Sequence, residues 1–296
     1  MMSSPTPTRP TVRLVLVIVG GLFAVSISSI LIRWCHAPAI VIATYRLAIA
    51  SGVLMIMAGR RRLALAVQLP GKIFLWGLLS GAFLAIHFSS WIRSLELTSV
   101  AISVVLVSTT PFFAALGSWL FLKRKPAGLF WLGLALSFVG LLLIVHASTP
   151  ASEDSMLGNG LALTGAAAMA GYILCGRYLR ARLDNFLYIL LAYSSAALVL
   201  LVSVQFTSFP MIGYSGQTYM LFVLIAVFPQ LLGHTSFNWA LKYLSAPVVS
   251  MLLLGEPVLA SILAWLLLDE TLTMLQIAGS VLILLGVGLA VRAETM

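Results

Sequence analysis

The sequence predicts an all-α integral membrane protein, with ten transmembrane helices arranged as a five-plus-five inverted repeat around a central cavity. The chain has 296 residues, of which 61% are hydrophobic and 8% are charged, and its mean hydropathy is +1.10. Roughly 25% charged residues are usual in a soluble domain, so this chain has too few polar side chains to cover a soluble globule. Two further observations support this fold class: a series of long apolar segments and an internal duplication.

Ten apolar segments are long enough to cross about 30 Å of hydrocarbon, which takes roughly 17 to 25 residues. We expect helices over residues 12–32, 39–58, 72–92, 98–122, 127–147, 157–179, 186–206, 217–241, 246–268 and 272–292.

The first of these segments follows a tail, MMSSPTPTRP, that we expect to be disordered. This first segment has no small-residue cleavage site, so we interpret it as a transmembrane helix of the mature protein and not as a removed signal peptide. The second segment ends before the run Arg60–Arg62, and the third contains His87 and Trp91. The fourth is centred on Pro111, and the fifth is rich in glycine.

The second set of five segments has a similar order of features. Its first two members are apolar and carry few charges, and the third contains His234 and Trp239. The fourth is centred on Pro257, and the last is again rich in glycine.

This similarity is an internal duplication, and repeats are best identified before any other feature. A single offset without a gap superimposes four pairs of special residues: Pro111 on Pro257, Trp119 on Trp265, Gly133 on Gly279 and Gly140 on Gly286. Two residues of slippage upstream then bring Trp91 onto Trp239. We therefore predict two domains, a first five-helix half over residues 1–150 and a second over 151–296.

Five is an odd number of crossings, so the second half must enter the membrane from the side opposite to the first. The segment ASTPASEDSMLG joins the two halves outside. Inverted repeats of this kind are a recurrent way to build secondary transporters, because a site between the halves can open to either side.

The net charge of +9 is explained by membrane topology and not by nucleic-acid binding. With the N-terminus in the cytoplasm, only Arg33 and Arg93 lie outside and Arg46 lies within the second helix. The other basic residues fall on the cytoplasmic side, as the positive-inside rule requires: Arg9, Arg13, Arg60, Arg61, Arg62, Lys72, Lys123, Arg124, Lys125, Arg177, Arg180, Arg182, Lys242 and Arg292. Both termini are therefore expected in the cytoplasm.

A Pro-centred helix followed by a Gly-rich one occurs as LLLGEPVLASILAWLLLDETLTMLQIAGSVLILLGVGLAV, with a weaker copy in the first half. This pairing resembles the EamA-type branch of the drug/metabolite transporter superfamily, over nearly the whole chain. The resemblance implies a ten-helix exporter of small metabolites such as amino acids, in which helices 5 and 10 brace a cavity formed by the others. One departure is that the acidic Glu270 has Arg124 as its counterpart in the first half.

Glu256 is the acidic residue deepest within an expected helix. A charged group at the centre of a membrane helix costs roughly 2.5–3.5 kcal/mol on insertion scales, and intramembrane ionisable groups are functional by default. The carboxyl group could face the cavity and bind a substrate amine or a proton. Alternatively, it could be protonated and hydrogen-bond to backbone carbonyls that Pro257 leaves free.

Arg46, His87 and His234 are the other ionisable candidates for substrate contact. Arg46 could pair with a carboxylate, or it could extend outward along its methylene stem to the membrane surface. The two histidines occupy nearly matching positions, four residues before Trp91 and five before Trp239. Each could contact substrate or serve as a hydrogen-bond partner between helices.

Aromatic and amide side chains supply the remaining candidates for the cavity wall. A site for small amphipathic ligands has mostly apolar walls with a few oriented polar groups. An interfacial belt of tryptophan and tyrosine is the alternative interpretation. The candidates are Trp91, Tyr172, Asn238 and Tyr45, together with Trp239, Tyr193 and Gln230.

Pro111 and Pro257 occupy equivalent places in the two halves, and each can bend its helix and free a carbonyl group. They are either moving hinges or static kinks. Gly133 and Gly140, like Gly279 and Gly286, are seven residues apart on one helix face, which favours close helix packing.

Recognisable motifs for a nucleotide loop, a nucleophile elbow or a zinc protease are not found in the sequence. We therefore expect a secondary transporter, not an enzyme, that exports small organic metabolites by alternating access; an intramembrane enzyme and a passive channel are the alternatives. We expect no cofactor or metal. The expected partners are a small-molecule substrate, the lipid bilayer and protons, without nucleic acid, for a monomer or homodimer in a bacterial-type inner membrane.

Overall fold

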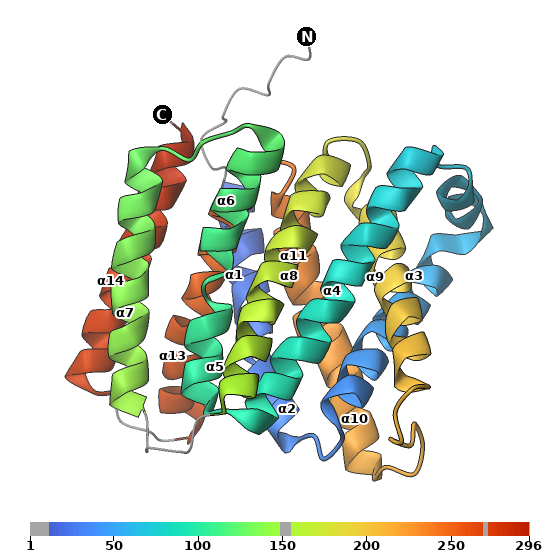
Figure 1. Cartoon of the computed structure of the whole chain (residues 1–296), viewed down its shortest axis with the longest axis horizontal. Helices are drawn as coiled ribbons and strands as arrows, with labels where there is room; N and C mark the ends of the chain where they lie inside the picture. Colours follow the sequence, from blue (N-terminus) through green and yellow to red (C-terminus); the bar gives the residue numbers. More distant parts are fainter. Residues whose placement is uncertain (1–11, 149–154, 269–271, 296) are drawn as a thin grey trace.

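The computed structural model describes residues 12–148, 155–268 and 272–295. The predicted N-terminal tail, linker residues 149–154 and Glu270 lie outside this part of the chain. Every regular element in the described part is a helix, and ten stretches of it are long and apolar enough to cross a membrane. These stretches match the ten predicted segments one for one, which confirms the predicted fold class (Figure 1).

The helices of the first half are α1 (Val12–Ser26), α2 (Ser28–Trp34), α3 (Ala39–Val67), α4 (Gly71–Leu97), α5 (Val100–Val107), α6 (Thr110–Leu122) and α7 (Gly128–Ser148). Those of the second half are α8 (Met156–Arg180), α9 (Asn185–Val204), α10 (Gly216–Ile225), η1 (Ala226–His234), α11 (Thr235–Ala240), α12 (Ala246–Leu252), η2 (Leu253–Gly255), α13 (Glu256–Leu268) and α14 (Met274–Thr295).

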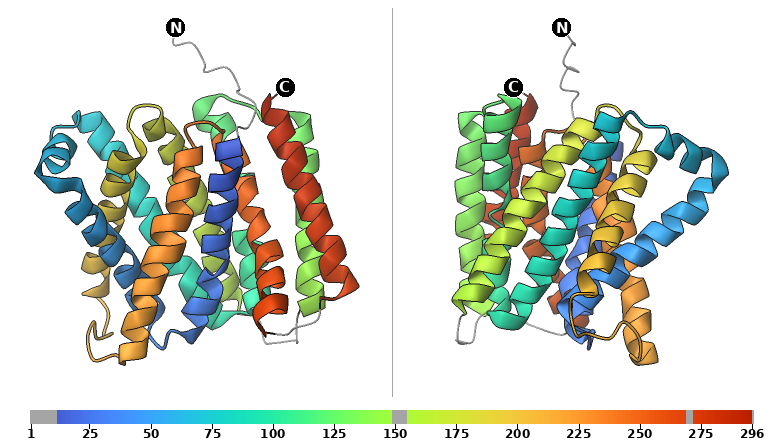
Figure 2. Two further views of the ribbon diagram at one scale, coloured as in Figure 1. Left: turned by 180° about the vertical axis from the view of Figure 1, so that it is seen from behind. Right: turned by 45° about the vertical axis from the view of Figure 1, so that its right-hand side comes forward.

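The packing of α7 against α14 makes the inverted relation between the halves visible. The two helices lie side by side at one end of the molecule and run in opposite directions (Figures 1 and 2). A Cβ atom added at Gly133 would lie within 3.0 Å of the Gly286 carbonyl oxygen, and one added at Gly279 would lie as close to the Gly140 carbonyl oxygen. Exchanging the halves converts one contact into the other, as a two-fold relation requires.

Several membrane spans are interrupted near their middle. The fourth span breaks between α5 and α6 at Ser108 and Thr109, and the ninth contains the tight turn η2 between α12 and α13. The eighth span contains the nine-residue π-helix η1, with Pro229 inside it. Interrupted helices are tolerated at membrane depth where the backbone is buried in protein or lines a cavity.

The second helix is longer than the sequence predicts, because α3 continues to Val67 instead of ending near residue 58. Gly59 marks a kink with φ of 61°, a conformation that glycine adopts without steric cost. The exposed Arg60, Arg61 and Arg62 lie on the extension, which projects from the body of the molecule (Figure 2). Hydropathy locates the apolar stretch, whereas the helix itself extends beyond it.

The start of α1 and the end of α14 lie on the same side of the molecule, which we call the terminal side (Figure 1). The connections from α3 to α4, from α6 to α7 and from α8 to α9 also lie on this side. Lys123, Arg124, Lys125 and Arg182 lie in these connections, and Arg60, Arg61, Arg62, Lys72, Arg177 and Arg180 lie on the helix ends beside them. The charge asymmetry used to predict topology therefore corresponds to one side of the structure.

Candidate functional site

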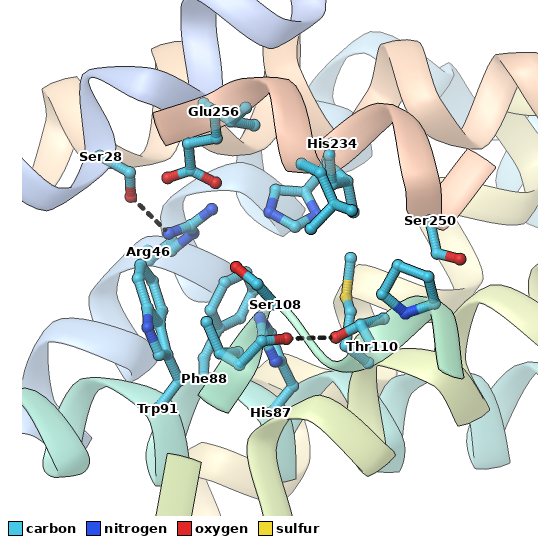
Figure 3. Close-up of a pocket in the computed structure, with 16 residues that line it drawn as sticks. Ser28, Arg46, His87, Phe88, Trp91, Ser108, Thr110, His234, Ser250 and Glu256 are labelled. Atoms are coloured by element: carbon cyan, nitrogen blue, oxygen red, sulfur yellow. Dashed lines mark hydrogen bonds between the residues drawn. The ribbon is translucent and has the colours of Figure 1, made fainter. Parts of the chain in front are cut away.

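A central cavity of about 80 Å³ lies between the two halves (Figure 3). Its walls come from α1 to α6 in the first half and from α8, η1 and the interrupted ninth span in the second. The polar lining residues are Ser28, Arg46, His87, Ser108, Thr110, His234, Ser250 and Glu256, and the other lining residues are Val25, Phe88, Trp91, Val107, Pro111, Met169, Leu253 and Leu254.

Two interrupted helices bring polar groups to this cavity. The break between α5 and α6 places Ser108 and Thr110 on the wall, and the turn η2 places Glu256 at the first position of α13. The Thr110 hydroxyl donates to the Val107 carbonyl oxygen at 2.7 Å, and the Thr109 hydroxyl donates to that of Leu106 at 2.6 Å. The carbonyl group of Val107, which the missing N–H of Pro111 leaves free, therefore finds a side-chain donor.

Arg46 is buried in the cavity wall, with 1% of its surface exposed. Its Nε donates to the Gln230 Oε1 at 2.7 Å, and its Nη1 donates to the Ser28 hydroxyl at 3.2 Å. Its guanidinium carbon lies 3.8 Å from the centroid of the Phe88 ring, in cation–π geometry. The interpretation that Arg46 extends to the membrane surface is therefore wrong, because its partners hold the charge inside the protein.

Glu256 also lines the cavity, and in the view of Figure 3 its carboxyl group lies beside the guanidinium group of Arg46. Among the described residues, the carboxyl group of Glu256 has no hydrogen-bond partner. Its oxygens also lie farther than 4.0 Å from the nitrogens of Arg46, so the two residues do not form an ion pair of the kind that Arg93 and Glu96 form. Arg46 and Glu256 thus balance each other's charge at a longer distance, without direct contact. Both groups are polar and both line the cavity.

Both predicted histidines line the cavity. The His87 Nδ1 lies 2.9 Å from the carbonyl oxygen of Gly165, which can only accept, so Nδ1 carries the hydrogen. The His87 ring is stacked on Trp91 with centroids 6.0 Å apart, and His234 lies edge-on to Phe88 at 5.3 Å. Within the described part of the chain, the Trp91 indole N–H has no acceptor.

Three other predicted site residues do not line this cavity. Tyr172 and Asn238 belong to a buried cluster in which the Asn238 amide donates to the Tyr172 and Tyr193 hydroxyl oxygens at 2.5 and 3.2 Å. The Arg180 Nε donates to the backbone carbonyl oxygen of Asn238 at 3.1 Å and brings a charge next to this cluster. Tyr45 instead donates to the Met211 carbonyl oxygen at 2.6 Å. Contact of these residues with substrate stays a prediction.

The two prolines lie directly after the breaks in their spans. Pro111 is the second residue of α6 and lines the cavity, whereas Pro257 is the second residue of α13 and does not. Proline is well suited to the first turn of a helix, because the N–H it lacks would have no partner there. The equivalent positions of the two bends agree with the internal duplication; whether the bends move stays a prediction.

Sequence reasoning did not identify several cavity residues. Ser108 and Thr110 could have been found, since hydroxyl residues directly before a mid-membrane proline can satisfy the carbonyls that it frees. Ser28, Phe88 and Ser250 carry no such signal in the sequence. Their position follows from how the helices pack.

Comparisons with known proteins agree with this architecture. The sequence profile of the EamA-like transporter family matches the chain twice, over residues 12–146 and 156–292. A relative from Bacillus subtilis (strain 168), named uncharacterized transporter YdfC, is 26% identical over 83% of this chain and 79% of its own length. An uncharacterized transporter of Archaeoglobus fulgidus is 26% identical over 66% of this chain and 68% of its own length.

A solved crystal structure has the same fold, with a TM-score of 0.78, 15% sequence identity and coverage of 95% of this chain and 97% of the other. Together with the duplicated sequence match, this similarity agrees with the two-half architecture around the central cavity. The chain therefore belongs to the EamA-like transporter family.

Proposed function

We propose that this protein is a secondary transporter that exports small organic metabolites, amino acids among them, by alternating access. The observation that carries this proposal is the position of the central cavity, which lies between two inverted halves and takes lining residues from both. A site in this position opens to one side or the other when the halves rock about it. The names of the relatives, which are transporters, support the same class of function.

The buried polar cluster of Tyr172, Tyr193 and Asn238 suits a barrier between the cavity and the terminal side. It lies on α8, α9 and α11, and α11 follows the cavity residue His234 toward that side (Figure 1). Arg180, the last residue of α8, links α8 to α11 beside this cluster, because its Nε donates to the backbone carbonyl oxygen of Asn238. In our proposal this barrier is closed when the cavity is accessible from the other side, and it separates in the opposite state.

The proposed orientation places both termini in the cytoplasm of a bacterial-type cell, as the basic connections on the terminal side favour. Proton movement is the proposed coupling. Glu256 is the acidic residue on the cavity wall, and it can exchange a proton as the access of the cavity changes.

Purified protein in liposomes, challenged with a panel of labelled metabolites with and without an imposed pH gradient, tests this proposal. We expect saturable movement of at least one solute, faster when the gradient is imposed. Chemical conversion of a solute without its movement would instead identify an intramembrane enzyme. Movement that rises linearly with concentration would identify a channel.

A further inference from the structure

We propose that Arg46 binds a carboxylate group of the transported solute and that Gln230 is the residue that positions it. This inference rests on the proposed transport function and assigns one part of the cavity to one chemical group.

Arg46 has donors that the protein leaves free. A guanidinium group has five N–H donors. Gln230 and Ser28 each accept one of them, so three have no acceptor among the described residues. A buried charge is stabilised only when its donors and its charge are compensated, and these free donors belong to the edge of Nη1 and Nη2. That edge matches the two oxygens of a carboxylate in bidentate geometry.

The protein itself does not supply this carboxylate. Glu256 is the acidic residue on the cavity wall, and it lies farther than 4.0 Å from the guanidinium nitrogens. Its charge keeps the empty cavity close to neutral while the bidentate edge stays vacant. The carboxylate of a solute adds one negative charge beside Glu256 and a doubly charged phosphate adds two, so the phosphate is repelled more strongly.

Gln230, which holds the Nε of Arg46, is fully buried. Its amide oxygen faces Arg46, because the opposite orientation would place two donors against each other. Its Nε2 is consequently left without a partner among the described residues. The π-helix η1 presents Gln230 at this point, and π-helical turns often occur at functional sites. A buried amide with one unsatisfied end lowers stability, and the orientation of Arg46 is a role that accounts for keeping it.

Cavity size agrees with a small group at this position. The volume of about 80 Å³ is smaller than the roughly 150 Å³ of an engineered cavity that binds benzene. A carboxylate with a short substituent therefore fits best, and a large aromatic solute would require the walls to separate.

The test compares acids with their amides on the full-length protein in lipid nanodiscs. Four pairs serve as probes: L-alanine and L-alaninamide, L-lactate and L-lactamide, L-leucine and L-leucinamide, and L-phenylalanine and L-phenylalaninamide, with sodium phosphate as a further anion. Affinity is obtained from the dependence of the unfolding midpoint on ligand concentration. We expect at least one acid to bind about tenfold more tightly than its amide, as the loss of a charge-assisted bidentate contact implies.

Three variants test the roles of the two residues. Arg46→Lys keeps the charge but loses the planar fork, so it should weaken binding of the acid about tenfold and leave the amide unaffected. Gln230→Leu should reduce the preference for acid over amide. Gln230→Glu should abolish this preference, because it supplies Arg46 with a carboxylate of the protein's own.

Ser51→Ala is the matched control, because it removes a 2.7 Å hydrogen bond between α3 and α9 away from the cavity. It should leave the preference for acids unchanged. A role for Gln230 limited to stability would shift acid and amide affinities equally, and that result would refute positioning.

The carboxylate site is refuted if no acid binds, if acids and amides bind equally in the parent protein, or if phosphate binds more tightly than every acid. The parent comparison needs no variant, so misfolding of a variant does not prevent the test. Solute movement in liposomes that persists after such a result would leave the proposed transport function standing. Absence of any solute movement would refute transport itself, whatever the binding data show.

Discussion

Replacing Gly286 by alanine should destabilise the protein more than replacing Gly288 by alanine. Both glycines lie in α14, so both substitutions gain the same helix propensity, about 1 kcal/mol. Their surroundings differ. A Cβ atom at Gly286 would collide with backbone and side-chain atoms of Ser137 and with the Gly133 carbonyl oxygen, whereas one at Gly288 would meet nothing within 4 Å.

The comparison therefore isolates the contact between α7 and α14. Backbone atoms cannot move aside as a flexible side chain can, so the helices must separate, and overpacking of this kind costs about 1–3 kcal/mol. We expect Gly286→Ala to be less stable than Gly288→Ala by that amount. Free energies of unfolding, measured in the same bicelles for both variants, provide the test.

The inverted relation between the halves adds a stricter expectation. Gly133→Ala and Gly279→Ala should be destabilised by similar amounts, because exchanging the halves interconverts their contacts. The double variant Gly133→Ala/Gly286→Ala should lose less than the sum of its parts, since one separation of the helices relieves both collisions. Equal stability of Gly286→Ala and Gly288→Ala would refute this account of the packing.

Three further predictions concern function and topology. Pro111→Ala and Pro257→Ala should lower the initial transport rate more than the yield of folded protein, because alanine allows each interrupted span to continue as a helix; parent rates in both variants would rule out hinges at these positions. Glu256→Gln should keep the fold and abolish the dependence of the transport rate on pH, measured in liposomes, because the amide cannot exchange a proton; superimposable pH profiles would rule out proton exchange at Glu256 as the coupling. Single cysteines in place of Arg61 and Gln205 should react with an impermeant thiol reagent from opposite sides of the membrane, the first from the cytoplasm, and labelling of both from one side would contradict the topology.

The two native cysteines give the labelling experiment a low background. Cys35 and Cys175 are both buried. Burial raises the pKa of the Cys35 thiol to about 11, so little of this thiol is in the reactive thiolate form near neutral pH. The protein without added cysteines is the control.

Membrane spans and their inverted arrangement could be predicted from the sequence for physical reasons. The thickness of the bilayer fixes the length of an apolar helix, and the coincidence of Pro111 with Pro257 fixes the relation of the halves. Helix ends were less predictable, because a helix such as α3 continues past the apolar stretch into the polar region. The break at Ile27 between α1 and α2 is not marked by proline or glycine at that position.

The cavity was partly predictable for a related reason. Arg46, His87, His234 and Glu256 line it, because an ionisable side chain within a span needs a polar environment. Tyrosine and asparagine can instead satisfy one another, as Tyr172 and Asn238 do, and the sequence does not reveal which partner each will find.

The pairing of Gln230 with Arg46 was not predictable. It depends on the π-helical winding of η1, which changes the face on which Gln230 lies, and hydrophobic periodicity carries no record of that winding.

Counterflow in liposomes tests the central claim, transport by alternating access through the cavity between the halves, most directly. Vesicles are loaded with an excess of the unlabelled solute identified by the panel, and a trace of the labelled solute is added outside. A carrier takes the labelled solute in, and the excess of unlabelled solute inside then occupies most of the sites that return outward. We therefore expect the label to accumulate transiently above its external concentration. Label that only equilibrates, without exceeding the external concentration, would contradict alternating access.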